Sequence, residues 1–389
     1  MDYLLFVAAE PSGDQHAAHL VRSLREKRPE LEFGAFGGEG LRDAGCHLFE
    51  NLMGSATMVV GFLGGLTRYL RTLRRFDRVL AERQPTAVVL VDSPGLNFLL
   101  ARLARWRRVP VIYYICPQIW AWSPWRRSKV IRWTDLLMPI LPFEEELYRD
   151  CGVPVRFVGH PLADELAKYS PEAGSELRRD LGIPTSRKVI GVFPGSRHQE
   201  VQGLADVFCR LIRRMAPAPE EPASVVVSCC RPEFRPVIEE AGRARLLEVE
   251  IFEGDARRLM LACDLAIVAS GTASLELVYF DKPMAVLYRT NRFGRMMFRY
   301  FGVTPWMALP NILGCSVNDG QATVIEELFV GDPCDEVVRH AHALLYDGEE
   351  RARAIDRLRR VKENVLRPGG VEKAATELLS FLVEKGLLG

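Results

Sequence analysis

Long uninterrupted runs of apolar residues alternate along this chain with segments in which apolar residues recur every three or four positions. The runs form two series, the first at 3–9, 86–92, 109–115, 135–141 and 155–159, the second at 188–193, 223–229, 264–270 and 283–288. Continuous rather than alternating apolar runs are typical of strands buried on both faces of a parallel sheet. The regular alternation of strands and helices therefore predicts an α/β fold.

A polar segment with two prolines separates the two series of runs. Residues 165–185 carry Pro171 and Pro184 among charged side chains, and from Asp335 onward the pattern is helical. Such a proline-containing polar segment is typical of a connection between domains. We therefore expect two doubly wound, Rossmann-like domains that face a cleft. Their expected bounds, with those of a final group of helices, are 1–168, 184–350 and 351–389.

Composition narrows the class of protein without defining its chemistry. The 51 basic and 50 acidic residues leave no overall charge that would attract nucleic acid. None of the nine cysteines is spaced C-x-x-C, which argues against a zinc site and for a reducing compartment. The apolar run at the N-terminus ends at Glu10 and predicts a strand instead of a signal peptide. The long uncharged windows at 51–67 and 109–125 are interrupted by glycine or proline, so neither predicts a membrane-spanning helix.

Ligands of doubly wound domains bind at the carboxyl ends of the strands, so four strand-to-helix turns are of interest. The first is AEPSGD, residues 9–14. Its Ser12, Gly13 and Asp14 can cap a helix expected over 14–28 and leave the helix amides near a ligand. By itself this turn indicates an ordinary helix cap, with Glu10 in solvent.

The second turn, VDSPGLN at 91–97, places Asp92 at the end of a fully apolar run. A half-desolvated carboxylate has a raised basicity, which suits a general base. Asp92 is equally suited to cap a helix that begins near Pro94, because proline is favoured at the first helical position. The sequence leaves these two interpretations of Asp92 open.

The third turn, FPGSRHQEV at 193–201, has the residues of an anion site. Gly195 gives the backbone conformational freedom, Ser196 offers a hydroxyl, and Arg197 offers a bidentate guanidinium beside a helix N-terminus. This combination suits a phosphate or a diphosphate.

The fourth turn, ASGTASLELVYFDKP at 269–283, opens a second helix directly after a strand, through Ser270, Gly271 and Thr272. Glu276 follows one turn into the helix, where it could accept hydrogen bonds from ribose hydroxyls. Two anion cradles in one domain indicate a nucleotide diphosphate. The chain contains no D-x-D motif, and enzymes that use Mg²⁺ to hold such a ligand generally supply clustered carboxylates. We therefore expect no metal and no other cofactor.

Residues 66–83 form the clearest amphipathic helix, with arginines on its polar faces. We expect its apolar stripe to cover the sheet; the stripe consists of Leu66, Tyr69, Leu70, Leu73, Phe76, Val79 and Leu80. The segment before the helix carries Val60, Phe62 and Leu63 without periodicity. An apolar loop followed by arginines predicts a surface contact with anionic lipid.

Several motifs together resemble the lipid-A-disaccharide synthase family of GT-B glycosyltransferases. The resemblance runs in order from the first strand to about Leu313, through VDSPGLN, PQIWAW, LPFE, GH, PGSR, SGTASLE and LPN. It implies an inverting enzyme of Gram-negative lipid A biosynthesis that transfers 2,3-diacylglucosamine from UDP to the 6-hydroxyl of 2,3-diacylglucosamine 1-phosphate. It further implies a cytoplasmic protein, monomeric or homodimeric, that is peripherally associated with the inner membrane.

The resemblance also assigns roles to individual residues. It implies catalytic roles for Asp92 and Arg197, the first in an acceptor-binding N-terminal domain and the second in a UDP-sugar-binding C-terminal domain. The UDP-sugar contacts that it implies are Gly195, Ser196, Arg197, Ser270, Gly271, Thr272, Glu276 and Asn311. The acceptor contacts are Glu10, Ser12, Gly13, Asp14, Gln118 and Trp120. The helices over 351–389 either pack back on the N-terminal domain or are exchanged in a dimer.

The segment PQIWAWSPWRR, residues 117–127, holds half of the six tryptophans, at Trp120, Trp122 and Trp125. We favour a wall of the acceptor cleft, with Gln118 and an indole N–H free to meet sugar or phosphate oxygens. A packed anchor for the loop is the alternative.

Two other functions are compatible with the same fold. One is a related enzyme, either another UDP-GlcNAc-type GT-B glycosyltransferase such as the peptidoglycan N-acetylglucosaminyltransferase or a UDP-GlcNAc 2-epimerase. The PQIWAW and VDSPGLN motifs argue against both. The other is a membrane-associated protein that binds a nucleotide sugar without turning it over.

Overall fold

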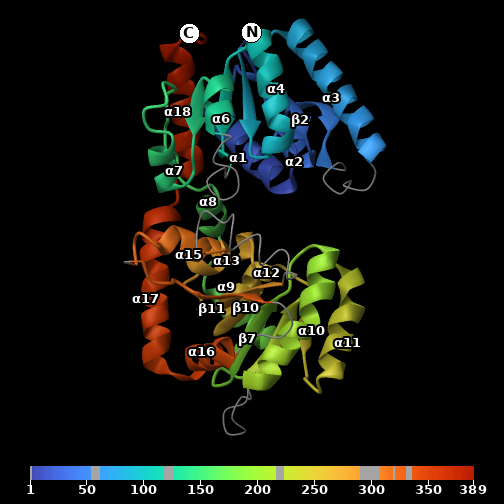
Figure 1. Ribbon diagram of the computed structural model, residues 1–389, viewed down its shortest axis with the longest axis vertical. Helices are drawn as coiled ribbons and strands as arrows, with labels where there is room; N and C mark the ends of the chain where they lie inside the picture. Colours follow the sequence, from blue (N-terminus) through green and yellow to red (C-terminus); the bar gives the residue numbers. More distant parts are fainter. Residues whose placement is uncertain are drawn as a thin grey trace. The chain divides into compact units, whose positions relative to one another are not determined.

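The computed structural model describes residues 2–53, 62–117, 127–215, 223–289, 306–318, 320–329 and 335–389. The chain forms two compact units: unit 1 is Met1–Asp164 with Arg367–Gly389, and unit 2 is Glu165–Leu366. Each unit has a six-stranded parallel sheet with helices packed on it (Figure 1). The α/β class with two doubly wound sheets is therefore confirmed.

The sheet of unit 1 has the strand order β3-β2-β1-β4-β5-β6. Its strands are β1 (Tyr3–Ala8), β2 (Glu32–Gly37), β3 (His47–Asn51), β4 (Ala87–Val91), β5 (Val111–Tyr114) and β6 (Leu136–Met138). β2 and β3 were not predicted, because β2 is interrupted by glycines and the edge strand β3 is only partly buried. The strand predicted over 155–159 is wrong: only Val155 forms a bridge, to Leu137. The segment still runs beside β6, because the amides of Arg156 and Val158 donate to the carbonyls of Leu137 and Pro139 at 2.9 and 3.1 Å, but it does not form a regular strand. The Arg156 side chain pairs with Glu377 and Glu384 of α18.

The helices of unit 1 include the last one of the chain. They are α1 (Pro11–Lys27), α2 (Glu39–Asp43), α3 (Phe62–Arg83), α4 (Pro94–Trp106), α6 (Arg127–Trp133), α7 (Pro142–Leu147) and α18 (Gly370–Glu384), while α8 (Leu162–Leu166) runs from unit 1 into unit 2. α18 packs against α1 (Figure 1). The Asp164 carboxylate accepts hydrogen bonds from the amides of Gly369 and Val371 and so fixes the start of α18.

Only the later part of the apolar stripe on α3 covers the sheet: Phe76, Val79 and Leu80 are buried and Leu73 packs against the same core, whereas Tyr69 and Leu70 are 45% and 42% exposed. The expectation that the whole stripe packs on the sheet is thus wrong. A helix of 22 residues is about 33 Å long. The strands β1 to β4 have five or six residues and span about 20 Å, so the first turns of α3 extend beyond them.

Unit 2 has the strand order β12-β11-β10-β7-β8-β9. Its strands are β7 (Lys188–Phe193), β8 (Ala223–Ser228), β9 (Glu250–Phe252), β10 (Leu265–Ala269), β11 (Met284–Arg289) and β12 (Ile325–Phe329). Its helices are α9 (Glu172–Asp180), α10 (His198–Met215), η3 (Pro232–Phe234), α11 (Arg235–Ala244), α12 (Ala256–Ala262), α13 (Thr272–Tyr279), α15 (Leu309–Gly314), α16 (Asp335–Tyr346) and α17 (Gly348–Val365). β9 and β12 were not predicted, because both carry glutamates in place of a continuous apolar run.

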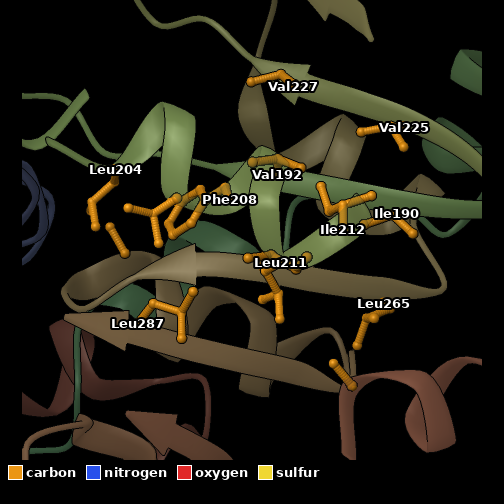
Figure 2. Packing of buried hydrophobic residues seen from close by; sticks show 14 of the residues in the cluster. Ile190, Val192, Leu204, Phe208, Leu211, Ile212, Val225, Val227, Leu265 and Leu287 are labelled. Atoms are coloured by element: carbon orange, nitrogen blue, oxygen red, sulfur yellow. The ribbon is translucent and has the colours of Figure 1, made fainter. Parts of the chain in front are cut away.

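The core of unit 2 forms between the central strands and α10. Figure 2 shows Phe208 of α10 beside Val192 of β7 and Ile212 of α10 beside Ile190 of β7. Burial of these apolar side chains stabilises the unit and fixes α10 against the sheet. Because α10 follows the turn after β7, this packing also fixes the position of the PGSR motif.

The segment expected to connect the domains, 165–185, belongs to unit 2 and forms α9, which packs against α12. The tail expected as one group of helices is divided, with α17 in unit 2 and α18 in unit 1. Among the described helices, none is both long and apolar enough to cross a membrane.

Candidate functional site

The site in unit 1 begins where β1 and β4 end. These strands pair in parallel with Ala8 opposite Val91, so the turns that carry Glu10 and Asp92 are neighbours. A Cβ added to Gly13 of α1 would lie 3.8 Å from Cγ1 of Val91. The first turn of α1 therefore lies close to the end of β4, as the AEPSGD and VDSPGLN motifs require if they contribute to one site.

Asp92 and Ser93 share an uncommon backbone conformation. Their φ angles are +49° and +41°, in the left-handed region that side chains other than glycine rarely occupy. Each such residue costs about 1–3 kcal/mol, and such strain is concentrated at functional sites. Ser93 occupies the N-cap position of α4, followed by Pro94. The interpretation of Asp92 as the cap of α4 is therefore wrong.

Three groups hold this strained turn through main-chain atoms of Asp92. The Asp92 carbonyl oxygen accepts a hydrogen bond from the Tyr113 hydroxyl at 2.7 Å and another from Asn97 Nδ2 at 2.7 Å. The Asp92 amide donates to the carbonyl of Tyr114 at 3.3 Å, which extends the pairing of β4 with β5 by one residue. The backbone of Asp92 is thus tied to β5 and α4.

The environment of Asp92 favours the protonated form of its carboxyl group. Burial raises the pKa of Asp92 from 3.8 to about 6, the charge of Glu10 adds to this rise, and a hydrogen bond from the Ser93 backbone opposes it. A carboxylate with a pKa near neutrality accepts a proton more readily than an ordinary aspartate. Its location and basicity suit a general base.

The helix α1 begins earlier than the sequence indicates. It starts at Pro11 with Glu10 as its N-cap, so the prediction that Ser12, Gly13 and Asp14 cap it is wrong. Proline at the first helical position explains the earlier start. The side chains of Glu10 and Ser12 are exposed, whereas Gly13 is buried.

Asp14 serves the architecture of unit 1. It is 4% exposed, and its carboxylate accepts hydrogen bonds from the amides of Gly38 at 2.6 Å, Gly40 at 2.8 Å and Leu41 at 3.4 Å. These bonds satisfy the first amides of α2. Because the carboxylate faces the protein interior, we do not include Asp14 among the acceptor contacts proposed below.

The remaining predicted residues of unit 1 fall mostly outside the described part of the chain. Gln118, Trp120 and Val60 lie outside the described residues. Phe62 and Leu63 form the start of α3, where only the backbone is described.

In unit 2, the PGSR and SGT turns follow neighbouring strands. β7 and β10 pair in parallel with Phe193 opposite Val268, so Gly195–Arg197 and Ser270–Thr272 emerge side by side. Gly195 has φ +105°, a conformation that favours glycine. α10 and α13 begin directly after these turns, and helix N-termini attract anions. The predicted cradles are therefore adjacent at one end of the sheet.

A carboxylate of the chain occupies the PGSR cradle. Glu200 Oε2 accepts hydrogen bonds from the amides of Ser196 and Arg197, each at 3.3 Å, and Glu200 Oε1 lies 3.5 Å from the Arg197 guanidinium. Arg197 is 82% exposed. The convergence of two amides and a guanidinium on one carboxylate shows that the turn can bind an oxyanion. Glu200 was not predicted as part of the cradle, although a glutamate three residues after Arg197 has the spacing of a capping box.

Glu276 is fixed by Arg257, a second residue that was not predicted from the sequence. Arg257 of α12 donates to Glu276 Oε1 from Nε at 3.1 Å and from a terminal nitrogen at 2.9 Å, and it also pairs with Glu165. Burial raises the pKa of Glu276, and the charge of Arg257 opposes the rise. Glu276 is thus held on the first turns of α13, beside the SGT cradle.

Asn311 has an internal role. It is completely buried, and its amide group donates to the Val324 carbonyl at 3.1 Å and to Glu326 Oε2 at 2.7 Å while accepting from the Val324 amide at 2.8 Å. These bonds join α15 to β12. We therefore assign Asn311 to the support of unit 2 and do not include it among the nucleotide contacts.

Solved structures with this arrangement define the class. The structure of UDP-GlcNAc 2-epimerase from Neisseria meningitidis bound to UDP-GlcNAc matches 99% of this chain and 100% of its own, at 15% identity and a TM-score of 0.58. That of Acinetobacter baumannii MurG matches 98% and 100%, at 11% identity and a TM-score of 0.60. At such identities the likeness shows the fold alone, that of the GT-B glycosyltransferases and epimerases.

Sequence relatives define the family within this class. The family model of lipid-A-disaccharide synthetase matches residues 4–375. The lipid-A-disaccharide synthase of Anaeromyxobacter dehalogenans (strain 2CP-1 / ATCC BAA-258) is 34% identical over 388 residues, 98% of each chain. That of Pseudomonas syringae pv. syringae (strain B728a) is 31% identical over 386 residues, 97% of each chain. The chain belongs to the lipid-A-disaccharide synthetase family and is a GT-B glycosyltransferase of lipid A disaccharide synthesis.

The raised pKa of Asp92 predicts a pH-dependent gain in stability on its neutralisation. Because the pKa is about 6 in the folded protein and 3.8 in the reference state, the folded state binds the proton more tightly. The free energy of unfolding therefore falls as pH rises from about 4 to about 6 and stays lower above this window. Asp92→Asn should thus be more stable than the wild type at pH 8, by about 1–3 kcal/mol.

Denaturant unfolding of both proteins at pH 8, 6 and 5 measures this difference, which should shrink as pH falls. A wild-type protein that is the more stable of the two at pH 8 would show that the carboxylate is stabilised by a partner and contradict the inferred environment.

Proposed function

We propose that this enzyme transfers 2,3-diacylglucosamine from UDP to the 6-hydroxyl of 2,3-diacylglucosamine 1-phosphate. The products are UDP and a disaccharide 1-phosphate with an inverted, β-1′,6 linkage. The observation that carries the proposal is the half-buried Asp92, held in a strained turn with a pKa of about 6 at the end of β4. Family membership supplies the reaction class, and Asp92 supplies the group that inversion by direct displacement requires.

In the proposed step, Asp92 removes the proton of the acceptor 6-hydroxyl as its oxygen attacks C1 of the donor sugar. The bond between C1 and the diphosphate oxygen breaks, and UDP leaves with the electron pair. The proton resides on the Asp92 carboxylate and then passes to solvent. A pKa of about 6 leaves this carboxylate mostly ionised at neutral pH while keeping it more basic than an ordinary aspartate.

The PGSR cradle would take up the charge of the leaving group. The diphosphate replaces the Glu200 carboxylate on the amides of Ser196 and Arg197 and on the guanidinium of Arg197. The SGT turn, through Ser270, Gly271 and Thr272, contributes the amides at the start of α13. Preorganised donors of this kind stabilise the charge that develops in a transition state.

The same donors support catalysis without a metal or another cofactor. Two helix N-termini and one arginine converge at the ends of β7 and β10, and the sequence has no D-x-D motif. These groups can neutralise a diphosphate without a cation. Glu276 and Gly195 complete the proposed nucleotide contacts. Glu276 would accept hydrogen bonds from the ribose hydroxyls, and Gly195 lies at the turn that receives the diphosphate.

We further propose that the enzyme is a peripheral protein on the cytoplasmic side of the inner membrane, and that unit 1 receives the lipid acceptor there. Glu10, Ser12 and Gly13 adjoin Asp92, and the sequence adds Gln118 and Trp120. The exposed Tyr69 and Leu70 on α3 are interspersed with exposed arginines at 71, 74, 75 and 78. Apolar and basic side chains together favour contact with anionic lipid. The enzyme would act there as a monomer or a homodimer.

The reaction itself is tested by incubating the purified protein with UDP-2,3-diacylglucosamine and 2,3-diacylglucosamine 1-phosphate. Mass spectrometry should detect the disaccharide 1-phosphate, with one UDP released per product. Excess EDTA should leave the rate unchanged, because helix amides and Arg197 are proposed to neutralise the diphosphate. Free 2,3-diacylglucosamine without a disaccharide would indicate hydrolysis of the UDP-sugar. Activity abolished by EDTA and restored by Mg²⁺ would refute the metal-free mechanism.

Substitution of Arg197 tests the leaving-group role. The charge on the β-phosphate grows in the transition state, so a contact to it should accelerate the step more than it tightens binding. Arg197→Ala should lower kcat by about 10²–10³-fold. Arg197→Lys keeps the charge and loses the bidentate geometry, so its kcat should lie between that of Arg197→Ala and that of the wild type. Because Arg197 is 82% exposed, thermal melts should be unchanged. An Arg197→Ala enzyme with a raised KM and an intact kcat would limit Arg197 to nucleotide binding.

Sedimentation with anionic vesicles tests the membrane contact. The double variant Tyr69→Ser, Leu70→Ser should bind about tenfold more weakly, because two exposed apolar side chains no longer enter the interface. Leu99→Ser is the matched control, since Leu99 is 43% exposed on α4, compared with 42% for Leu70. Equal vesicle binding by the double variant and the control would place the membrane contact elsewhere. A melting temperature of the double variant equal to that of the wild type would confirm that Tyr69 and Leu70 are not core residues.

A further inference from the structure

Tyr113 and Tyr114 are neighbours on β5 with the same burial and different surroundings. Both side chains are completely buried. The Tyr113 hydroxyl donates to the Asp92 carbonyl at 2.7 Å. Within the part of the chain that the structure describes, the Tyr114 hydroxyl is buried without a hydrogen-bond partner. Since successive side chains of a strand point to opposite faces of the sheet, only Tyr113 reaches the turn after β4.

The carbonyl that Tyr113 contacts belongs to the strained turn. Asp92 and Ser93 have φ angles of +49° and +41°, and neither is a glycine. Relaxation of such a turn toward ordinary angles would rotate the Asp92 peptide and carry its side chain away from the end of β4. The hydroxyl of Tyr113 and Nδ2 of Asn97 bind the same oxygen, so both oppose that rotation.

We propose that Tyr113 is a positioning residue for the transfer reaction, which holds the Asp92 carboxylate in its working orientation through the Asp92 carbonyl. This inference rests on the proposed catalytic role of Asp92. Tyr113 touches neither substrate, and its hydroxyl takes no proton during the reaction. Asn97 of α4 acts on the same oxygen and contributes to the same positioning.

The isosteric pair Tyr113→Phe and Tyr114→Phe tests the proposal. Each variant loses one buried hydroxyl from the same strand, and only the first loses a hydrogen bond to the described part of the chain. Tyr113→Phe should lower kcat about tenfold, because a small displacement of a catalytic group slows the step. KM for the UDP-sugar should stay the same, since the nucleotide is proposed to bind in unit 2. Tyr114→Phe should retain the wild-type kcat.

The pH dependence of kcat supplies a readout that a loss of stability would not move. Among the described residues, the titratable groups that act on Asp92 are Glu10 after β1 and Tyr113 on β5, and burial is the largest influence on its pKa. A turn that relaxes in Tyr113→Phe exposes the carboxylate, so the acidic limb of the kcat profile should shift to lower pH. The acidic limb of Tyr114→Phe should coincide with that of the wild type.

Assays run well below the melting temperature of each variant exclude unfolding as the cause of a lower kcat. Asn97→Ala removes the other donor to the same oxygen and should reproduce both the loss of kcat and the shifted limb. Equal kcat values and pH profiles in Tyr113→Phe and Tyr114→Phe would overturn the inference.

Asp92→Asn, measured in parallel, separates this outcome from failure of the proposed function. An active Asp92→Asn enzyme would show that Asp92 is not the general base, and the proposed role of Asp92 would fail together with that of Tyr113. An inactive one, with Tyr113→Phe like the control, would overturn only the positioning role.

Discussion

Parallel pairing of the central strands determines where chemistry can occur in this enzyme. β1 and β4 of unit 1, and β7 and β10 of unit 2, are buried on both faces by helices. Their carboxyl ends are where polar groups can first emerge from the apolar sheet. The pairing sets Ala8 opposite Val91 and Phe193 opposite Val268. Each unit therefore presents two turns at one sheet edge, although the turns of a pair are about 80 residues apart in sequence.

The two units handle charge in opposite ways. Unit 1 brings the Glu10 carboxylate toward the desolvated Asp92, which makes ionisation less favourable and the carboxylate more basic. Unit 2 brings the amides of Ser196 and Arg197 together with the Arg197 guanidinium, and the Glu200 carboxylate accepts hydrogen bonds from these donors. A base for the acceptor hydroxyl and a site for the anionic leaving group are the two requirements of a displacement on a nucleotide sugar. In the proposed reaction, Asp92 of unit 1 would meet the first requirement and the PGSR cradle of unit 2 the second.

The site in unit 1 lowers the stability of the fold that contains it. Asp92 combines left-handed backbone angles with a desolvated charge, and neither arrangement stabilises the folded chain. The hydrogen bonds from Tyr113 and Asn97 and the close packing of β1, β4 and β5 offset this cost. By contrast, Asp14 lies in the first turn of α1 with its carboxylate fully used by three amides. Two aspartates near one sheet edge therefore have opposite effects: three amides offset the burial of the Asp14 charge, whereas burial outweighs the hydrogen bond from the Ser93 backbone at Asp92.

The sequence by itself determined the features that depend on neighbours along the chain. Continuous apolar runs defined the central strands, and the residues after them defined the turns around Asp92, Arg197 and Thr272. Their motifs were sufficient to indicate the family. Edge strands such as β3 and β9 were missed because they are short and only partly buried.

Tertiary structure decided which polar side chains are committed to the fold and which remain available for chemistry. Tyr113 and Asp92 are 21 positions apart, Arg257 and Glu276 are 19 apart, and Asp14 and Gly38 are 24 apart. Each contact forms only when packing of the sheet and helices brings the two segments together. Local patterns could not show that Asn311 is enclosed, because its partners Val324 and Glu326 lie 13 and 15 positions away. A side chain's role follows from the groups that surround it, and those groups come from distant parts of the chain.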